Sequence, residues 1–231
     1  MRIYVLEHHP MEGIGTIADW AERGGHTITT TRWYEAVTPP DPDSFDLLVV
    51  MGGPMNVYEE SEYPWLADEK RFLDRCIGAG RWILGICLGA QLLAERLGGP
   101  VGRNAWTEIG WWPVSRTLEA APDPILSALP ERMDAFHWHG DTFAVPHGAI
   151  HAAYSAACAA QAFRKGRVLG LQFHLELSEK ALEGLVEATE SYDGMYVQSP
   201  ETFLPRADRF ERLREANFAF LDAIASEIRR A

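Results

Sequence analysis

Short apolar runs recur along this chain of 231 residues, and segments with helical patterns separate most of them. The clearest runs lie at 2–7, 45–51, 82–86 and 168–173. A short run that is apolar on both faces is typical of a strand buried inside a parallel sheet. Strands that alternate with helices need crossover connections, which place helices on both faces of the sheet. We therefore predict an α/β fold with a doubly wound, mostly parallel sheet.

Periodic apolar patterns predict helices at 13–23, 64–79 and 92–97, and a further strand at 26–33. After residue 100 the pattern changes, because short apolar segments follow one another with turn residues between them. These segments lie at 109–114, 134–138, 150–154 and 160–163. They predict a small antiparallel addition to the parallel sheet.

The last part of the chain has helical patterns on either side of a stretch without one. We expect a helix at 178–189, an irregular loop at 191–205 and a docked amphipathic helix at 208–230. The length suits one large core. We therefore expect a single domain over 1–231, with a motif core at about 45–180 and a C-terminal helical extension at about 191–231.

Cys87 lies where the strand at 82–86 passes into a helix, between Gly85 and Gly89. Glycines two residues before and after it allow a sharp turn and keep other side chains away from the sulfur. The start of a helix also favours the thiolate form of a cysteine. We interpret this stretch as a nucleophile elbow, although a buried and inert cysteine in a glycine-rich turn fits the same residues.

His174 and Glu176 directly follow the strand at 168–173. A cysteine nucleophile needs a base, and the base needs a third group that orients it. Residues two apart in an extended segment point the same way, so this carboxylate can orient this imidazole. A lone histidine is more often structural. The combination with a cysteine elbow nevertheless predicts a triad of Cys87, His174 and Glu176.

Gly52, Gly53 and Pro54 follow the strand at 45–51. A tetrahedral intermediate needs N–H groups aimed at its oxyanion, and glycines permit a close approach. We expect the N–H groups of Gly53 and Leu88 to form this oxyanion hole. A simple tight turn is the alternative.

Composition excludes several classes of function. The formal net charge is -12 and no basic cluster is present, which disfavours nucleic acid and anionic membranes as partners. The three cysteines are widely spaced, which argues against a disulfide framework. The first residues predict a strand instead of a signal peptide, and no apolar run is long enough to span a bilayer, so we expect a cytoplasmic protein.

Five motifs together resemble the class I, or triad, glutamine amidotransferases, especially stand-alone proteins like the glutaminase domain of GMP synthase. They occur in family order over about residues 45 to 180 and are 52–54, 85–91, 108–111, 139–141 and 170–176. The resemblance implies a flavodoxin-like amidotransferase fold and the triad named above. It also implies that Gly52, Gln91, His139, Gly140 and Asp141 bind the substrate. Leu175 departs from the pattern, since many members carry proline there.

The activity implied by the resemblance is hydrolysis of the γ-amide of glutamine through a glutamyl thioester, without a metal or an organic cofactor. Ammonia would then pass to an acceptor, which requires a separate synthetase subunit because this chain lacks a synthetase domain. The alternative is a γ-glutamyl peptidase or hydrolase that acts on a substituted γ-glutamyl amide.

Three further interpretations are less favoured. His137, His139 and Asp141 resemble part of a metallo-hydrolase signature, to which His8 and His9 could add ligands. In a cysteine-elbow protein of another class, an acid on the first strand such as Glu7 would lie against the thiol of Cys87. A non-catalytic relative is disfavoured because all three triad positions are filled.

Overall fold

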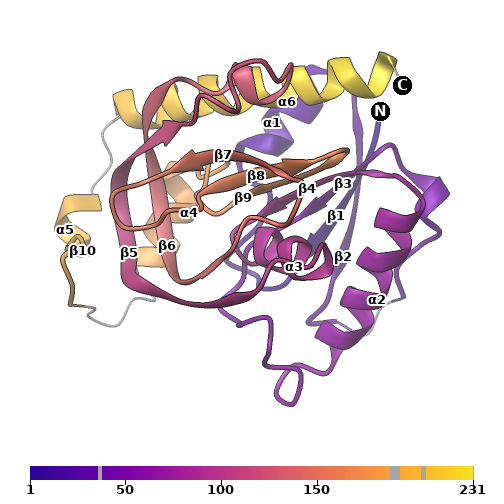
Figure 1. Cartoon of the computed structure of the whole chain (residues 1–231), viewed down its shortest axis with the longest axis horizontal. Coiled ribbons are helices and arrows are strands. Elements are labelled where there is room, and N and C mark those ends of the chain that lie inside the picture. The colour runs from indigo at the N-terminus through magenta and orange to yellow at the C-terminus, as the bar shows by residue number, and fades with distance from the viewer. Residues whose placement is uncertain (36–37, 188–192, 204–206, 231) are drawn as a thin grey trace.

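The computed structural model describes residues 1–35, 38–187, 193–203 and 207–230, and strands within these residues form one ten-stranded sheet. Helices cover both faces of this sheet (Figure 1). The core on one face includes α1 (Thr16–Arg23) and α6 (Ala207–Arg230), and the core on the other includes α2 (Trp65–Gly78) and α3 (Leu88–Arg96). The predicted doubly wound arrangement is therefore present.

Five neighbouring parallel strands form the part of the sheet that ends at the edge strand β2. Their order is β9 (Val168–Leu171), β4 (Trp82–Ile86), β3 (Leu47–Val50), β1 (Arg2–Glu7) and β2 (Thr27–Arg32). The predicted strands are confirmed, and three of them are shorter than predicted by one or two residues at an end.

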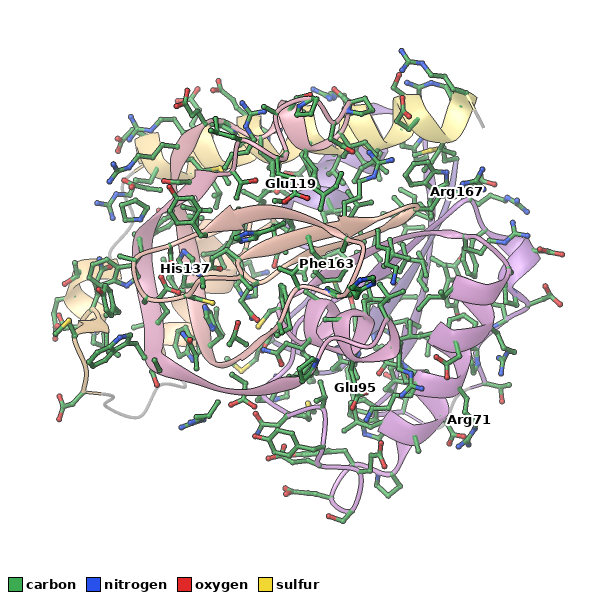
Figure 2. The ribbon with its side chains drawn as sticks, in the orientation of Figure 1. Arg71, Glu95, Glu119, His137, Phe163 and Arg167 are labelled. Carbon is green, nitrogen blue, oxygen red and sulfur yellow. The ribbon has the colours of Figure 1, made fainter. Side chains whose placement is uncertain are left out.

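The two faces of the sheet carry separate cores. In β1, Ile3 and Val5 pack on the face that α1 and α6 cover, whereas Tyr4 and Leu6 pack on the face of α2 and α3. This alternation follows from the two-residue period of a strand. Figure 2 shows Phe163 among the side chains at the middle of the molecule, and its side chain is fully buried.

The antiparallel part is larger than the sequence predicts. β5 (Val101–Arg116) and β6 (Arg132–Phe143) form a long antiparallel pair, and β7 (Ile150–Tyr154) and β8 (Ala162–Lys165) connect β5 to β9. The prediction of short strands at 109–114 and 134–138 was wrong in length. Polar residues such as Thr107 and Asp141 interrupt the apolar pattern, but the backbone pairing of the two strands continues past them.

The C-terminal part also differs from the prediction. α4 (Glu179–Glu187) matches the helix predicted at 178–189, whose last two residues lie outside the described residues. The stretch 191–205 was predicted to be irregular, yet its described residues include β10 (Tyr196–Val197) and α5 (Pro200–Phe203). β10 pairs with β5, and the side chain of Gln198 hydrogen-bonds both backbone groups of Trp111.

α6 docks along the sheet as predicted, beside α1 (Figure 1). Trp20 Nε1 donates to Asp222 Oδ1 at 2.7 Å, and Asn217 Nδ2 donates to Thr16 Oγ1 at 2.9 Å. Among the helices of the described residues, none is long and apolar enough to cross a membrane.

The topology determines which loops meet. β1, β3, β4 and β9 are neighbours and run in parallel, so their carboxyl ends lie along one edge of the sheet. In open α/β sheets, ligands bind at this edge.

Candidate active site

Cys87 lies in a strained turn between β4 and α3. Its φ is 51°, which makes it the one residue other than glycine with a positive φ among those described. A Cβ atom on Gly85 would lie 2.5 Å from the carbonyl oxygen of Gly89, and one on Gly89 would overlap the carbonyl oxygen of Val50. Glycine is therefore required at both positions, and the strained conformation is typical of functional sites.

His174 lies beside the elbow because β9 is the neighbour of β4. The N–H of Cys87 donates to the carbonyl oxygen of Leu171 at 2.8 Å, and the N–H of His174 donates to Phe136 at 2.9 Å. Nδ1 of His174 lies 2.7 Å from Oε1 of Glu176, as the two-residue spacing predicts. Because a carboxylate accepts, Nδ1 carries the proton, and Nε2 is the atom left to act on Cys87.

The charges around His174 favour its protonated form. Burial would lower the pKa of His174, but the Glu176 carboxylate and Cys87 outweigh burial and hold this pKa well above its usual range. Leu175 lies between these two residues in the sequence, and its side chain is buried in the hydrophobic core. The departure from proline at this position therefore leaves His174 and Glu176 in contact.

Gly53 lies against Leu88 at the start of α3. A Cβ atom on Gly53 would lie 2.9 Å from Leu88 Cδ2 and 2.9 Å from His8 Cβ. The N–H of Leu88 is in the first turn of the helix, where the helix itself supplies no acceptor. The residues predicted to form the oxyanion hole are thus neighbours.

His8 holds the loop that contains Gly52 and Gly53. Its Nδ1 lies 2.9 Å from the carbonyl oxygen of Gly52, and its Nε2 lies 2.9 and 3.0 Å from the two carboxylate oxygens of Glu69. All these partners accept, so both ring nitrogens must donate and His8 is an imidazolium. Burial opposes this charge, but Glu69 outweighs burial and raises the pKa of His8.

The triad and the residues predicted to form the oxyanion hole border a cleft of about 420 Å³. Every predicted site residue except Gly52 lines it, namely Cys87, His174, Glu176, Gly53, Leu88, Gln91, His139, Gly140 and Asp141. Gly52 faces Glu12 and His174, and its carbonyl oxygen contacts His8.

Gln91 is buried and connects two walls of the cleft. Its Nε2 lies 3.1 Å from Oε1 of Gln172 and 3.2 Å from the carbonyl oxygen of Asp141. Gln172 in turn donates to the sulfur of Cys87 at 3.6 Å. We did not predict a role for Gln172. Its position two residues before His174, and so on the same side of an extended segment, was the available signal.

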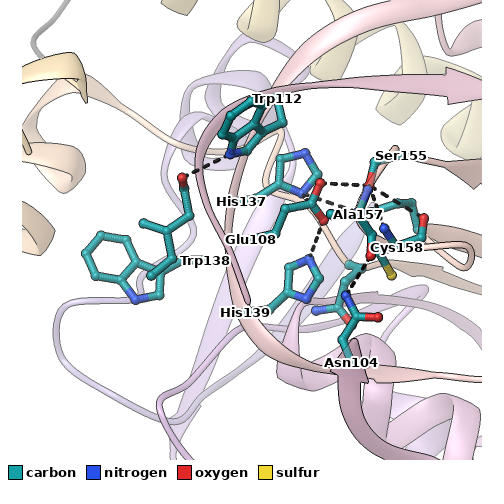
Figure 3. A network of polar contacts seen from close by, with 12 residues as sticks. Asn104, Glu108, Trp112, His137, Trp138, His139, Ser155, Ala157 and Cys158 are labelled. Atoms are coloured by element: carbon teal, nitrogen blue, oxygen red, sulfur yellow. Dashed lines mark hydrogen bonds and ion pairs between the residues drawn. The ribbon is translucent and has the colours of Figure 1, made fainter. Parts of the chain in front are cut away.

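A buried polar network lies behind His139 (Figure 3). Oε2 of Glu108 lies 3.1 Å from Nε2 of His139 and accepts from Gln161 Nε2 at 2.7 Å. Ser155 donates to Oε1 of Glu108 at 2.7 Å. Nδ1 of His139 is 3.0 Å from the carbonyl oxygen of Asp141, so the network holds the wall at 139–141 in place.

The same network contains the group of residues best suited to hold a metal. One ligand atom from each of Glu108, His137 and His139 lies within 4.8 Å of the others. Burial lowers the pKa of His137 to about 3, so its ring is neutral. The ligand set proposed from the sequence is not assembled, because Tyr58 binds the Asp141 carboxylate and Glu69 binds His8. Gln161 already donates to Glu108 inside the network.

The carboxylate that lies near the reacting groups belongs to Glu12 and not to Glu7. The less favoured cysteine-elbow class would place Glu7 against the thiol of Cys87. The carboxylate of Glu7 instead pairs with Arg32 at 3.1 Å. Glu12, for which we predicted no role, lines the cleft beside His174. It lies in the turn after β1, where the sequence has no periodic apolar pattern from which the position of its side chain could be predicted.

Comparisons with known proteins agree with this geometry. The family model described as glutamine amidotransferase class-I matches residues 16–187. The glutamine amidotransferase-like protein YfeJ of Salmonella typhimurium is 32% identical over 97% of both chains. A glutamine-hydrolyzing GMP synthase subunit of Picrophilus torridus is 29% identical over 77% of this chain and 90% of its own. The crystal structure of a glutamine amidotransferase from Thermotoga maritima superposes with a TM-score of 0.85, with 28% identity and 97% of both chains covered.

Proposed function

We propose that this chain, which belongs to the class I glutamine amidotransferase family, hydrolyses the γ-amide of glutamine with Cys87 as its nucleophile. The observation that carries this proposal is the meeting of the strained cysteine turn after β4 with the His174 and Glu176 pair after β9. Family membership, the predicted motifs and this geometry all support the same chemistry.

The first half of the proposed reaction forms a thioester. Sγ of Cys87, whose proton is already on Nε2 of His174, attacks the γ-carbonyl carbon of glutamine as a thiolate. The carbonyl oxygen becomes an oxyanion that accepts hydrogen bonds from the N–H groups of Gly53 and Leu88. When the C–N bond breaks, its electron pair goes to nitrogen. His174 gives the proton to that nitrogen, and ammonia leaves.

The second half releases glutamate. His174 takes a proton from water, and the water oxygen attacks the thioester carbon in the same oxyanion hole. The C–S bond breaks and its electron pair goes to the sulfur, which again faces the protonated ring of His174 as a thiolate. Glu176 orients the imidazole and stabilises its charged form in both halves, which agrees with the raised pKa of His174.

We assign the α-amino acid end of the substrate to the opposite wall of the cleft. Gln91, His139, Gly140 and Asp141 line this wall, and Gly52 supports the loop beside it. The Glu108 network stiffens the wall through His139. In this proposal the site uses no metal or organic cofactor.

The ammonia released needs an acceptor. The relatives include a protein named as one subunit of a glutamine-hydrolyzing GMP synthase, so we propose that a separate synthetase subunit receives the ammonia. A cytoplasmic location would suit such a partner.

One observation favours a second candidate function. A cleft of about 420 Å³ is large enough for ligands of drug size, and apolar side chains of α4 line it beyond His174. A γ-glutamyl hydrolase that acts on a substituted amide would use this space for the substituent.

The test of the main proposal is turnover of glutamine by the purified protein, followed as glutamate and ammonia, with and without cell extract. We expect Cys87→Ala to abolish turnover and Cys76→Ala to keep it, because Cys76 lies buried on α2 away from the cleft. Full turnover by Cys87→Ala would disprove the proposal. Activity that rises only with extract would indicate the missing partner.

A further inference from the structure

The turn after β1 places the carboxylate of Glu12 in the cleft, and the reaction proposed above does not use this carboxylate. We propose that Glu12 receives the leaving amine, and that it selects γ-glutamyl amides whose amine carries no carboxylate. This inference rests on the proposed function, since it concerns the leaving group of the same reaction.

Glu12 is close to the reacting groups. A Cβ atom on Gly52 would overlap Oε2 of Glu12 and would lie 3.4 Å from Cε1 of His174. The carboxylate and the imidazole therefore face the same point beside the glycine loop. The backbone fixes this turn, because the N–H of Glu12 donates to the carbonyl oxygen of His9 at 3.1 Å.

Within the described residues, none donates a hydrogen bond to the side chain of Glu12, although this side chain is half-buried. Burial and the neighbouring Glu176 carboxylate raise the pKa of Glu12, and they outweigh His174 and His8, which act to lower it. A half-buried carboxylate without a donor is costly, so a ligand that brings N–H groups or positive charge is favoured there.

The leaving nitrogen must lie on the side of His174, because His174 supplies its proton. On that side the cleft has a second wall, formed by the turn after β1 and by α4. The two parts lie close together, since the N–H of Thr16 donates to the carbonyl oxygen of Glu176 at 2.8 Å and a Cβ atom on Gly184 would lie 3.8 Å from Cε of Met11. The apolar residues of this wall are Met11, Leu177, Ala181 and Leu185.

This wall defines the class of leaving group. Ammonia or an amine leaves with N–H groups that donate to the Glu12 carboxylate, and an alkyl substituent lies against the apolar residues. Glu12 forms and breaks no covalent bond. A γ-glutamyl amino acid would instead bring a second carboxylate toward Glu12 and Glu176, and this like-charge contact is unfavourable.

The test compares three substrates: glutamine, γ-glutamyl-butylamide and γ-glutamyl-glycine. We expect the wild-type protein to have a kcat/KM for γ-glutamyl-butylamide about tenfold or more above that for γ-glutamyl-glycine, as one close like-charge pair implies. Glu12→Gln keeps the shape but removes the charge, and it should lower this ratio about tenfold. Because the ratio compares two substrates on one preparation, partial unfolding of the variant cancels.

Glu7→Gln is the matched control, since Glu7 lies at the end of β1 but pairs with Arg32 outside the cleft. It should leave the ratio unchanged. If Glu12→Gln has the wild-type ratio, or if wild-type protein prefers γ-glutamyl-glycine, the role of Glu12 is refuted while the proposed hydrolysis stands. If no γ-glutamyl compound is cleaved in a Cys87-dependent way, the proposed function and this inference both fail.

Discussion

Nδ1 of His8 donates to the carbonyl oxygen of Gly52 at 2.9 Å, at the end of β3. This oxygen belongs to the same planar peptide group as the N–H of Gly53, and the two point in opposite directions. His8 therefore determines where the Gly53 N–H points. Glu69 on α2 binds the far side of the same ring, so a buried ion pair orients the predicted oxyanion hole.

Glu69→Gln tests this relationship. The neutral amide cannot compensate the charge of a buried imidazolium, so His8 loses a proton. The hydrogen bond from His8 to the carbonyl oxygen of Gly52 then weakens. We expect kcat for glutamine to fall about tenfold to a hundredfold with KM nearly unchanged, since an oxyanion hole acts in the transition state. Steady-state kinetics measures this split.

Alkylation of Cys87 by iodoacetamide distinguishes misorientation of the loop from damage to the triad, because this reaction passes through no oxyanion. Its rate should stay at the wild-type value in Glu69→Gln. Glu60→Gln is the control, as Glu60 pairs with Lys70 at the surface of the molecule. Equal losses of alkylation and hydrolysis would contradict the assigned role.

Gly53→Ala should reduce kcat about a hundredfold or more, the cost typical of losing one oxyanion donor. The added Cβ would lie 2.9 Å from both Leu88 Cδ2 and His8 Cβ, so the loop must move. Gly78→Ala is the control, because no atom lies within 4 Å of a Cβ at this position on α2. An unchanged kcat in Gly53→Ala would mean that another group stabilises the oxyanion.

Much of this site could be predicted because its residues are marked by local patterns. Gly85, Cys87 and Gly89 mark a tight turn, and the two-residue spacing of His174 and Glu176 places them on one side of an extended segment. The apolar runs before them identify the strands, and parallel strands bring their ends to one edge. The chemical roles of these residues stay predictions until activity is measured.

The residues that sequence reasoning missed act across large separations. Glu69 contacts His8 from the first half of α2, and nothing local distinguishes it from the other acids of that helix, Asp68 and Asp74. Glu108 was recognised only as part of a motif, yet it joins His139, Ser155 and Gln161. The pairing of β5 with β6 was underestimated because backbone hydrogen bonds, which carry no sequence pattern, extend it beyond the apolar residues.

Dialysis against a chelator should leave glutamine turnover unchanged, because the proposed reaction uses a thiolate and an imidazole and no metal. Metal analysis of the purified protein by mass spectrometry checks the same point. If activity falls and zinc restores it, the cluster of Glu108, His137 and His139 is the place to examine first. In that case the Glu108→Gln variant should bind no metal, and zinc should not restore its activity.

The neutral ring of His137 should make the protein less stable in acid. Its pKa is lowered to about 3 by burial, whereas in the unfolded chain it is near the usual value of about 6.5. Between these values the unfolded chain binds a proton that the folded protein does not. The contribution of His137 to the free energy of unfolding is therefore intact above about pH 6.5. It declines as the pH falls toward 3, by up to about 1.4 kcal/mol per pH unit.

Urea unfolding at several pH values between 7 and 4 measures this decline. His137→Gln removes the titrating imidazole but keeps a side chain that can form hydrogen bonds. As the pH is lowered, the free energy of unfolding of this variant should therefore fall less steeply than that of the wild-type protein. His147→Gln, a change in the exposed turn after β6, should keep the wild-type slope. If the slopes of His137→Gln and wild type agree, the ring of His137 takes up its proton in the folded state, and the Glu108 network must then accommodate a buried positive charge on His137.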